Sequence, residues 1–123
     1  MSKTVMIVDD SSVMRMTVIN VLKDAGYTMI EASNGITALE KLGAYKIHLI
    51  ISDVNMPNMD GLTFVKKVKE LPDYKFVPII MLTTVTGQDK IEIGKAAGIK
   101  AWMVKPFDKT KLIGAVAKLL GQG

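Results

Sequence analysis

Two apolar runs of this chain lead into aspartates, and the three aspartates could together bind a metal ion. Residues 5–8 run into Asp9 and Asp10, and residues 49–51 run through one serine into Asp53. Short runs rich in β-branched residues that stop at a polar turn are typical of buried strands in a parallel sheet. If the two strands run in the same direction, the carboxylates meet at the carboxyl edge of the sheet, where open α/β folds bind ligands. Such charges repel one another unless a cation joins them, so the arrangement predicts a divalent metal.

Strand-like and helix-like patterns alternate along the whole chain and would position these residues. The expected strands cover residues 3–9, 28–32, 48–53, 77–83 and 101–104. The expected helices follow them at about 12–25, 34–43, 60–71, 86–97 and 108–120. Five such units with buried parallel strands predict a doubly wound α/β sheet.

The spacing of apolar and capping residues predicts how some of these helices lie. In the first helix we expect an inner face made of Val13, Met16, Ile19, Val21 and Leu22. Thr86 and Asp89 are the expected caps of the fourth helix. Asp108 is the expected cap of the last helix.

Composition restricts the class of protein. The chain has 123 residues, 49% of them hydrophobic, which predicts a single domain over 1–123 with a substantial core. It contains no cysteine and no run of about 18 apolar residues, so we expect a cytoplasmic protein without a membrane span. The net charge of +4 comes from scattered lysines rather than a basic patch with aromatic residues, so we expect no binding to nucleic acid.

The motifs of the chain resemble those of the response-regulator receiver family. The matching residues, in chain order, are Asp9-Asp10, Asp53, the Met-Pro-x-Met-Asp-Gly run at 56–61, Thr83, and Lys105-Pro106-Phe107. Each motif alone is weak, but five in register across the whole chain are specific. Because nothing follows the receiver pattern, we expect a stand-alone regulator of the chemotaxis type.

The resemblance implies the fold and the chemistry of the site. It implies a flavodoxin-like five-stranded parallel sheet of order 2-1-3-4-5 with five helices, and a phosphoacceptor switch rather than an enzyme. Asp53 would be the phosphoacceptor. Asp10, Asp53 and the backbone carbonyl of Asn55 would coordinate Mg²⁺, for which Mn²⁺ could substitute, and Asp9 would act through water.

Four further residues take roles from the same resemblance. Lys105 would place its ammonium on the phosphoryl group, and Thr83 would donate its hydroxyl to it. Trp102 stands where the family has an aromatic switch residue, usually tyrosine. Thr84 stands where relatives mostly carry a smaller residue, so we expect it to narrow the entrance to the site. The Lys105-Pro106 bond resembles the family's cis peptide.

The resemblance also implies partners. The phosphoryl donor would be a histidine kinase of the chemotaxis type. The output partner would be the flagellar motor switch protein, in control of flagellar rotation, bound through the fourth helix, fifth strand and fifth helix. A phosphatase is a further candidate partner, and the protein is expected to be a monomer. The alternative is a phosphorelay intermediate or phosphate sink that exchanges the group with a histidine phosphotransfer domain.

Other readings explain less of the sequence. The acidic pair could simply precede a helix N-terminus that favours negative charge, but this does not account for Asp53 or Lys105. Hydrolases that form an aspartyl phosphate place a second aspartate two residues after the first, and here that position is Ser11. No glycine-rich nucleotide-binding fingerprint is present.

Overall fold

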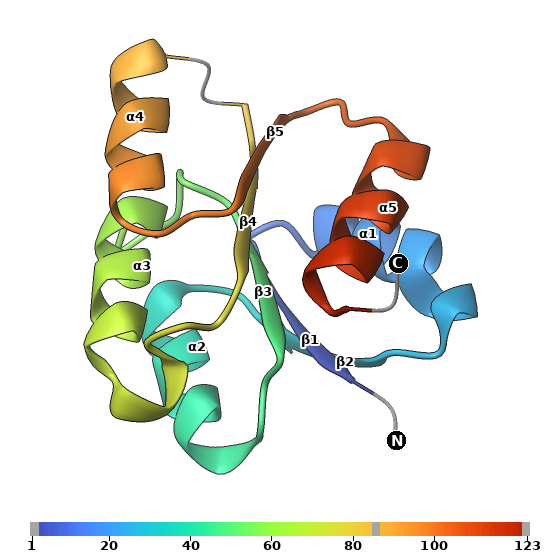
Figure 1. Cartoon of the computed structure of the whole chain (residues 1–123), viewed down its shortest axis with the longest axis horizontal. Helices are drawn as coiled ribbons and strands as arrows, with labels where there is room; N and C mark the ends of the chain where they lie inside the picture. The colour runs from blue at the N-terminus through green and yellow to red at the C-terminus, as the bar shows by residue number, and fades with distance from the viewer. Residues whose placement is uncertain (1–2, 85–86, 122–123) are drawn as a thin grey trace.

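The protein is a five-stranded parallel sheet with helices on both faces (Figure 1), as seen in a computed structural model that describes residues 3–84 and 87–121. The strand order is β2-β1-β3-β4-β5, which confirms the predicted fold. The strands are β1 (Thr4–Val8), β2 (Thr28–Ala32), β3 (Leu49–Ser52), β4 (Ile79–Thr83) and β5 (Ala101–Val104). The helices are α1 (Ser12–Leu22), α2 (Gly35–Ala44), α3 (Gly61–Glu70), α4 (Gln88–Ala96) and α5 (Lys109–Leu119), with 3₁₀ turns at Lys23–Ala25 and Pro72–Tyr74.

The sheet separates two hydrophobic cores. Helices α1 and α5 cover one face, and α2, α3 and α4 cover the other (Figure 1). Because successive side chains of a strand point to opposite faces, β1 supplies both cores. Val5 and Ile7 pack on the side of α1 and α5, whereas Met6 and Val8 pack on the side of α2 and α3. This burial on both faces explains why the strands read as continuous apolar runs.

Helix α1 buries only part of the face that we predicted. Val18 and Leu22 are its buried residues, whereas Val13 is 74% and Met16 is 54% exposed. Apolar side chains occur all around this helix, so the periodicity could not select the buried stripe. The prediction was therefore right for Leu22 and for the partly buried Ile19 and Val21, and wrong for Val13 and Met16.

The helix caps were predicted in part. Asp108 caps α5 as expected, because its carboxylate accepts a hydrogen bond from the Lys111 N–H at 3.0 Å. Helix α4 instead begins after Gly87, so Asp89 lies inside the helix and is not its cap. Thr86, the other expected cap, lies outside the described residues.

Among the helices of the described part of the chain, none has the length and apolar character needed to cross a bilayer.

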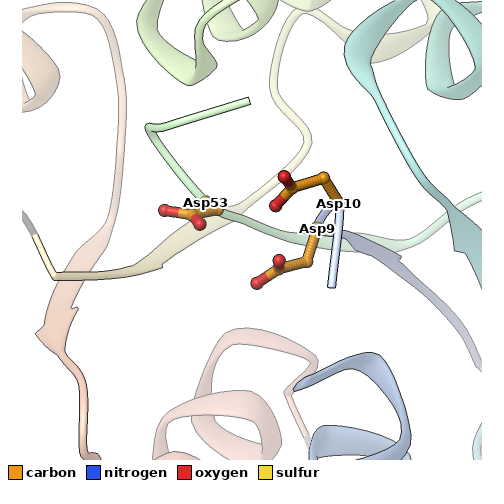
Figure 2. Close-up of side chains that lie close together, drawn as sticks. All are labelled: Asp9, Asp10 and Asp53. Carbon is orange, nitrogen blue, oxygen red and sulfur yellow. The ribbon is translucent and has the colours of Figure 1, made fainter. Parts of the chain in front are cut away.

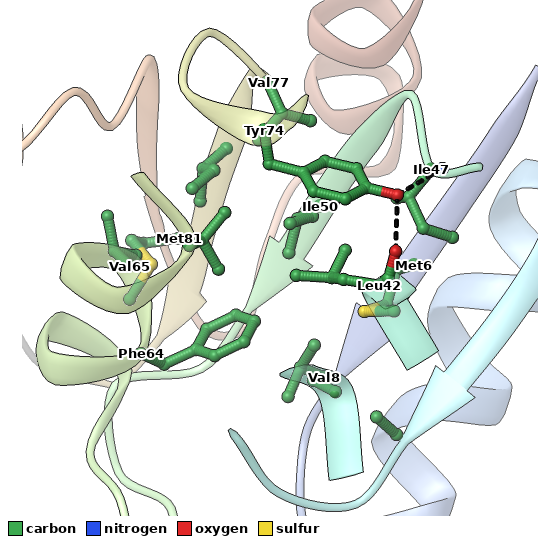
Figure 3. Packing of buried hydrophobic residues seen from close by; sticks show 14 of the residues in the cluster. Met6, Val8, Leu42, Ile47, Ile50, Phe64, Val65, Tyr74, Val77 and Met81 are labelled. Carbon is green, nitrogen blue, oxygen red and sulfur yellow. Dashed lines mark hydrogen bonds between the residues drawn. The ribbon is translucent and has the colours of Figure 1, made fainter. Parts of the chain in front are cut away.

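A buried tyrosine links the turn after α3 to the last turn of α2 and to the segment between α2 and β3 (Figure 3). Tyr74 is 8% exposed, and its hydroxyl lies 2.9 Å from the Leu42 carbonyl oxygen and 2.7 Å from that of Tyr45. The same hydroxyl accepts a hydrogen bond from the Ile47 N–H at 3.3 Å. One phenol oxygen therefore satisfies backbone groups that would otherwise be buried without partners.

We predict that Tyr74→Phe lowers the free energy of unfolding by about 1–2 kcal/mol, because it leaves a buried N–H and a buried carbonyl unsatisfied. Urea denaturation measures this directly. Tyr45→Phe is the matched control, since the Tyr45 side chain is exposed and its loss of a hydroxyl should change stability by less than about 0.5 kcal/mol. Equal effects of the two variants would contradict the prediction.

Candidate functional site

The register of the parallel strands brings the polar strand ends together. Val8 of β1 pairs with Ser52 of β3, so the next residues, Asp9 and Asp53, lie beside each other. The Asp53 N–H donates to the Val8 carbonyl at 3.0 Å and continues the ladder past the strand ends. Thr83 of β4 pairs with Val104 of β5, which puts Lys105 at the same edge of the sheet.

Three carboxylates converge at this edge (Figure 2). Asp9, Asp10 and Asp53 each offer one oxygen, and these oxygens all lie within 4.8 Å of one another. Asp9 is 4% and Asp53 is 8% exposed, whereas Asp10 is open to solvent. An all-oxygen donor set of carboxylates fits Mg²⁺, which is bound through a few carboxylates while keeping part of its water. The short distances among these oxygens confirm the predicted convergence of the three aspartates.

The ammonium group of Lys105 neutralises part of this negative charge. Its Nζ lies 2.8 Å from Asp9 Oδ2 and 3.3 Å from Asp53 Oδ2. Burial by itself would lower the pKa of Lys105, but the hydrogen bond and charge of Asp9, together with those of Asp53, outweigh it and raise that pKa above its ordinary value. The lysine is thus held in its charged form. The Lys105-Pro106 peptide that precedes α5 is cis, as the resemblance implied.

The loop after β3 holds the Asp53 carboxylate from its other side. Asp53 Oδ1 accepts the N–H groups of Val54 at 2.7 Å and Asn55 at 3.3 Å. The loop closes where the Gly61 N–H donates to the Val54 carbonyl at 2.7 Å. This close approach requires glycine, because a Cβ at position 61 would lie 2.1 Å from the carbonyl oxygen of Asp53. Asn55, whose carbonyl we expect to bind the metal, lies in this loop and is exposed.

The two threonines at the end of β4 differ in their surroundings. Thr83 is fully buried at the end of the strand, and its carbonyl accepts the Lys105 N–H at 2.8 Å. Thr84 is exposed in the bend that follows. Thr83 is therefore an inner residue of this edge of the sheet, and Thr84 is an outer one.

Trp102 lies on the face of the sheet that α3 and α4 cover. It pairs with Met81 in β4 and packs, partly buried, against the core that contains Met81 and Ile99. Because residues two apart share a face, Thr83 points to the same side as Met81 and Trp102. The indole lies directly against α4, since a Cβ at Gly94 would come within 2.9 Å of Trp102 Cζ3.

The sequence that forms this fold and this site matches one protein family along nearly the whole chain. The model of the response regulator receiver domain matches residues 5–117. The chain belongs to the response-regulator receiver family. Its receiver sequence is 41% identical over 118 residues to chemotaxis protein CheY1 of Helicobacter pylori, covering 94% of this chain and 95% of that protein.

Two further relatives agree in length and fold with this receiver. The chemotaxis protein CheY homolog of Campylobacter jejuni is 38% identical over 120 residues, which cover 96% of this chain and 92% of the homolog. The crystallised chemotaxis protein CheY4 of Vibrio cholerae is 44% identical and superposes with a TM-score of 0.90, covering 97% of this chain and 99% of that one. The chain therefore spans nearly the full length of these relatives.

One residue of the receiver site was missed by the sequence analysis. Arg15 of α1 donates from Nη1 to the carbonyl oxygen of Asp9 at 2.6 Å. Two features of the sequence could have pointed to Arg15. It is the one arginine among 16 basic residues, and it follows the acidic pair by little more than one helical turn. No motif that we used contained it.

We predict that Gly61→Ala lowers the free energy of unfolding of this receiver by about 1–3 kcal/mol, because the new methyl group overlaps the Asp53 carbonyl. Gly43→Ala is the matched control. Position 43 lies in α2 with no atom within 4 Å of the added methyl, so alanine should raise stability by up to about 1 kcal/mol. Thermal or urea unfolding of the two variants should shift in opposite directions, and a shift in the same direction would contradict the close approach at Gly61.

Proposed function

We propose that this receiver is a phosphorylation-controlled switch that accepts a phosphoryl group from a histidine kinase on Asp53. The observation that carries the proposal is the joining of Asp9 and Asp53 by the Lys105 ammonium, with the Asp10 carboxylate beside them. A carboxylate nucleophile and a phosphoryl donor are both anionic, so their reaction requires positive charge at this place. Lys105 supplies part of this positive charge, and a bound divalent metal ion would supply the rest.

The proposed reaction forms an aspartyl phosphate. A carboxylate oxygen of Asp53 attacks phosphorus, the bond from phosphorus to the donor's imidazole nitrogen breaks, and that nitrogen leaves with the electron pair. Oδ1 of Asp53 is held by two backbone N–H groups, while Oδ2 contacts only Lys105 among the described hydrogen-bond partners. We therefore assign the attack to Oδ2.

A divalent metal completes the proposed site. Asp10, Asp53 and the Asn55 carbonyl would hold Mg²⁺ or Mn²⁺ directly, and Asp9 would act through water. When bound, the ion would neutralise charge on the transferring phosphoryl oxygens. Within the chain, Lys105 would contribute a compact positive charge to the phosphoryl group, and Thr83 would donate its hydroxyl to a phosphoryl oxygen.

The output of the switch would pass through Trp102. Thr83 and Trp102 share one face of the sheet, and the indole touches Gly94 of α4. If Thr83 moves toward a phosphoryl group, the space beside it becomes available to the indole. The surface of α4, β5 and α5 would change with it, as in a two-state element biased by a local change of charge.

The role that we propose for this switch is in chemotaxis. Relatives 41% and 38% identical are chemotaxis proteins. We therefore propose a chemotaxis-type histidine kinase as donor and the flagellar motor switch protein as partner, bound through the α4-β5-α5 surface. The protein would act in the cytoplasm as a single-domain monomer, and a phosphatase would shorten the phosphorylated state.

The fluorescence of Trp102, the single tryptophan, tests the proposal. Mg²⁺ with beryllofluoride, which mimics a phosphoryl group on a carboxylate, should change the emission of the wild-type protein. Asp53→Asn should abolish this response because the amide cannot hold the mimic. Asp60→Asn is the matched control, because Asp60 caps the nearby helix α3 and asparagine caps equally well. A response that survives in Asp53→Asn would locate binding elsewhere and refute the assignment.

Thr84→Ala should raise the rate of phosphorylation by a small donor such as acetyl phosphate. The side chain stands exposed directly after buried Thr83, where its branch would narrow access to Asp53. Initial rates followed by Trp102 emission measure the effect, and Thr84→Val, which keeps the branch, is the control. Unchanged kinetics in Thr84→Ala would show that Thr84 is not a gate.

A further inference from the structure

The single arginine of the chain links α1 to both the acidic site and the edge strand. Arg15 Nη1 donates to the Asp9 carbonyl at 2.6 Å, and Nε donates to Glu31 Oε1 at 2.9 Å. The Arg15 side chain is only 16% exposed. A guanidinium presents several donors in a fixed plane, so one side chain can hold both partners in a defined geometry.

The carbonyl that Arg15 holds belongs to the peptide between Asp9 and Asp10. The rest of Asp9 is fixed independently, because its N–H donates to Ala32 and its carboxylate accepts from the Ser11 N–H and from Lys105. Asp10 is exposed and projects from the far end of this peptide. The orientation of the peptide therefore sets the direction of the Asp10 carboxylate.

The other partner of Arg15 is anchored in the sheet. Glu31 belongs to β2 and pairs in register with Ile7 of β1. Its carbonyl also accepts the Lys41 ammonium of α2 at 2.5 Å. Glu31 thus gives the guanidinium a fixed position relative to the end of β1.

We infer that Arg15 is a positioning residue for the metal site, which holds the peptide between Asp9 and Asp10 so that the Asp10 carboxylate points to the ion. The inference rests on the proposed function, because it concerns the same Mg²⁺ site. Residues that orient metal ligands through hydrogen bonds typically change metal affinity by about 10–100-fold when they are replaced.

Electrostatics alone predicts the opposite result. Arg15 is a cation next to a site for another cation, so deleting its charge should strengthen Mg²⁺ binding if charge were its only contribution. Positioning predicts that binding becomes weaker although a repulsive charge has been removed. The sign of the change therefore distinguishes the two roles.

The test is Mg²⁺ binding by isothermal titration calorimetry to the full chain without phosphoryl donor. We expect Arg15→Met to weaken affinity about tenfold, at the lower end of that range because Asp9 keeps its other hydrogen bonds. Arg15→Lys keeps the positive charge but cannot hydrogen-bond the Asp9 carbonyl and Glu31 together from one rigid plane, so we expect an intermediate loss of Mg²⁺ affinity. Lys23→Met, at the exposed far end of α1, is the control for removal of a positive charge and should leave affinity unchanged.

The outcomes separate this inference from the proposed function. Tighter or unchanged binding by Arg15→Met, in a protein whose circular dichroism matches the wild type, overturns the positioning role and leaves the metal site intact. If Arg15→Met does not fold, wild-type affinity in Arg15→Lys overturns it equally. If the wild type itself binds no Mg²⁺, the proposed site fails and the inference fails with it.

Discussion

The repulsion among Asp9, Asp10 and Asp53 is the constraint that the rest of the structure has to satisfy. Their oxygens lie within 4.8 Å of one another, and two of the three residues are buried, where negative charge is costly without compensation. The Lys105 ammonium provides that compensation from the end of β5. The backbone N–H groups after Asp53 add further stabilisation of its carboxylate. One ammonium offsets only one of the three carboxylate charges, so the site keeps a net negative charge that a divalent metal ion would balance.

The parallel sheet makes this concentration of charge possible. Strands that run in one direction end at one edge, so groups far apart in the sequence meet there without any direct connection between them. The two apolar cores hold β1, β3 and β4 in register on both faces. A shift of register by one residue would exchange the faces of every side chain in a strand. Hydrophobic packing of the strands thus fixes the positions of the charged groups at the strand ends, although those groups lie outside the two apolar cores.

The contrast between apolar strands and the polar residues at their ends explains which features could be predicted from the sequence. Strand ends are visible as the points where apolar runs stop, so the places of Asp53, Thr83 and Lys105 followed from the pattern and from the convergence of parallel strands. The buried stripe of α1 followed only in part, because Val13 and Met16 are as apolar as the buried Val18 and Leu22. The contact of Arg15 with the Asp9 carbonyl depends on the distance between a helix and a strand end, which no local pattern encodes. The cap of α4 was not predicted correctly, because several polar residues near its start could serve as caps, and one of the two expected, Asp89, lies inside the helix.

The contact between Trp102 and Gly94 has a mechanical consequence. With no side chain at position 94, the indole ring packs, together with Ile99, directly against the backbone of α4 and acts as a spacer between α4 and that part of β5. Packed interiors resist compression, and a flat ring is thinner across its face than along its edge. Any rotation of the indole therefore changes the thickness of the spacer, and α4 has to translate or tilt to match. A bulkier residue at position 94 would contact β5 with its own side chain, and the position of α4 would then no longer depend on the orientation of the indole.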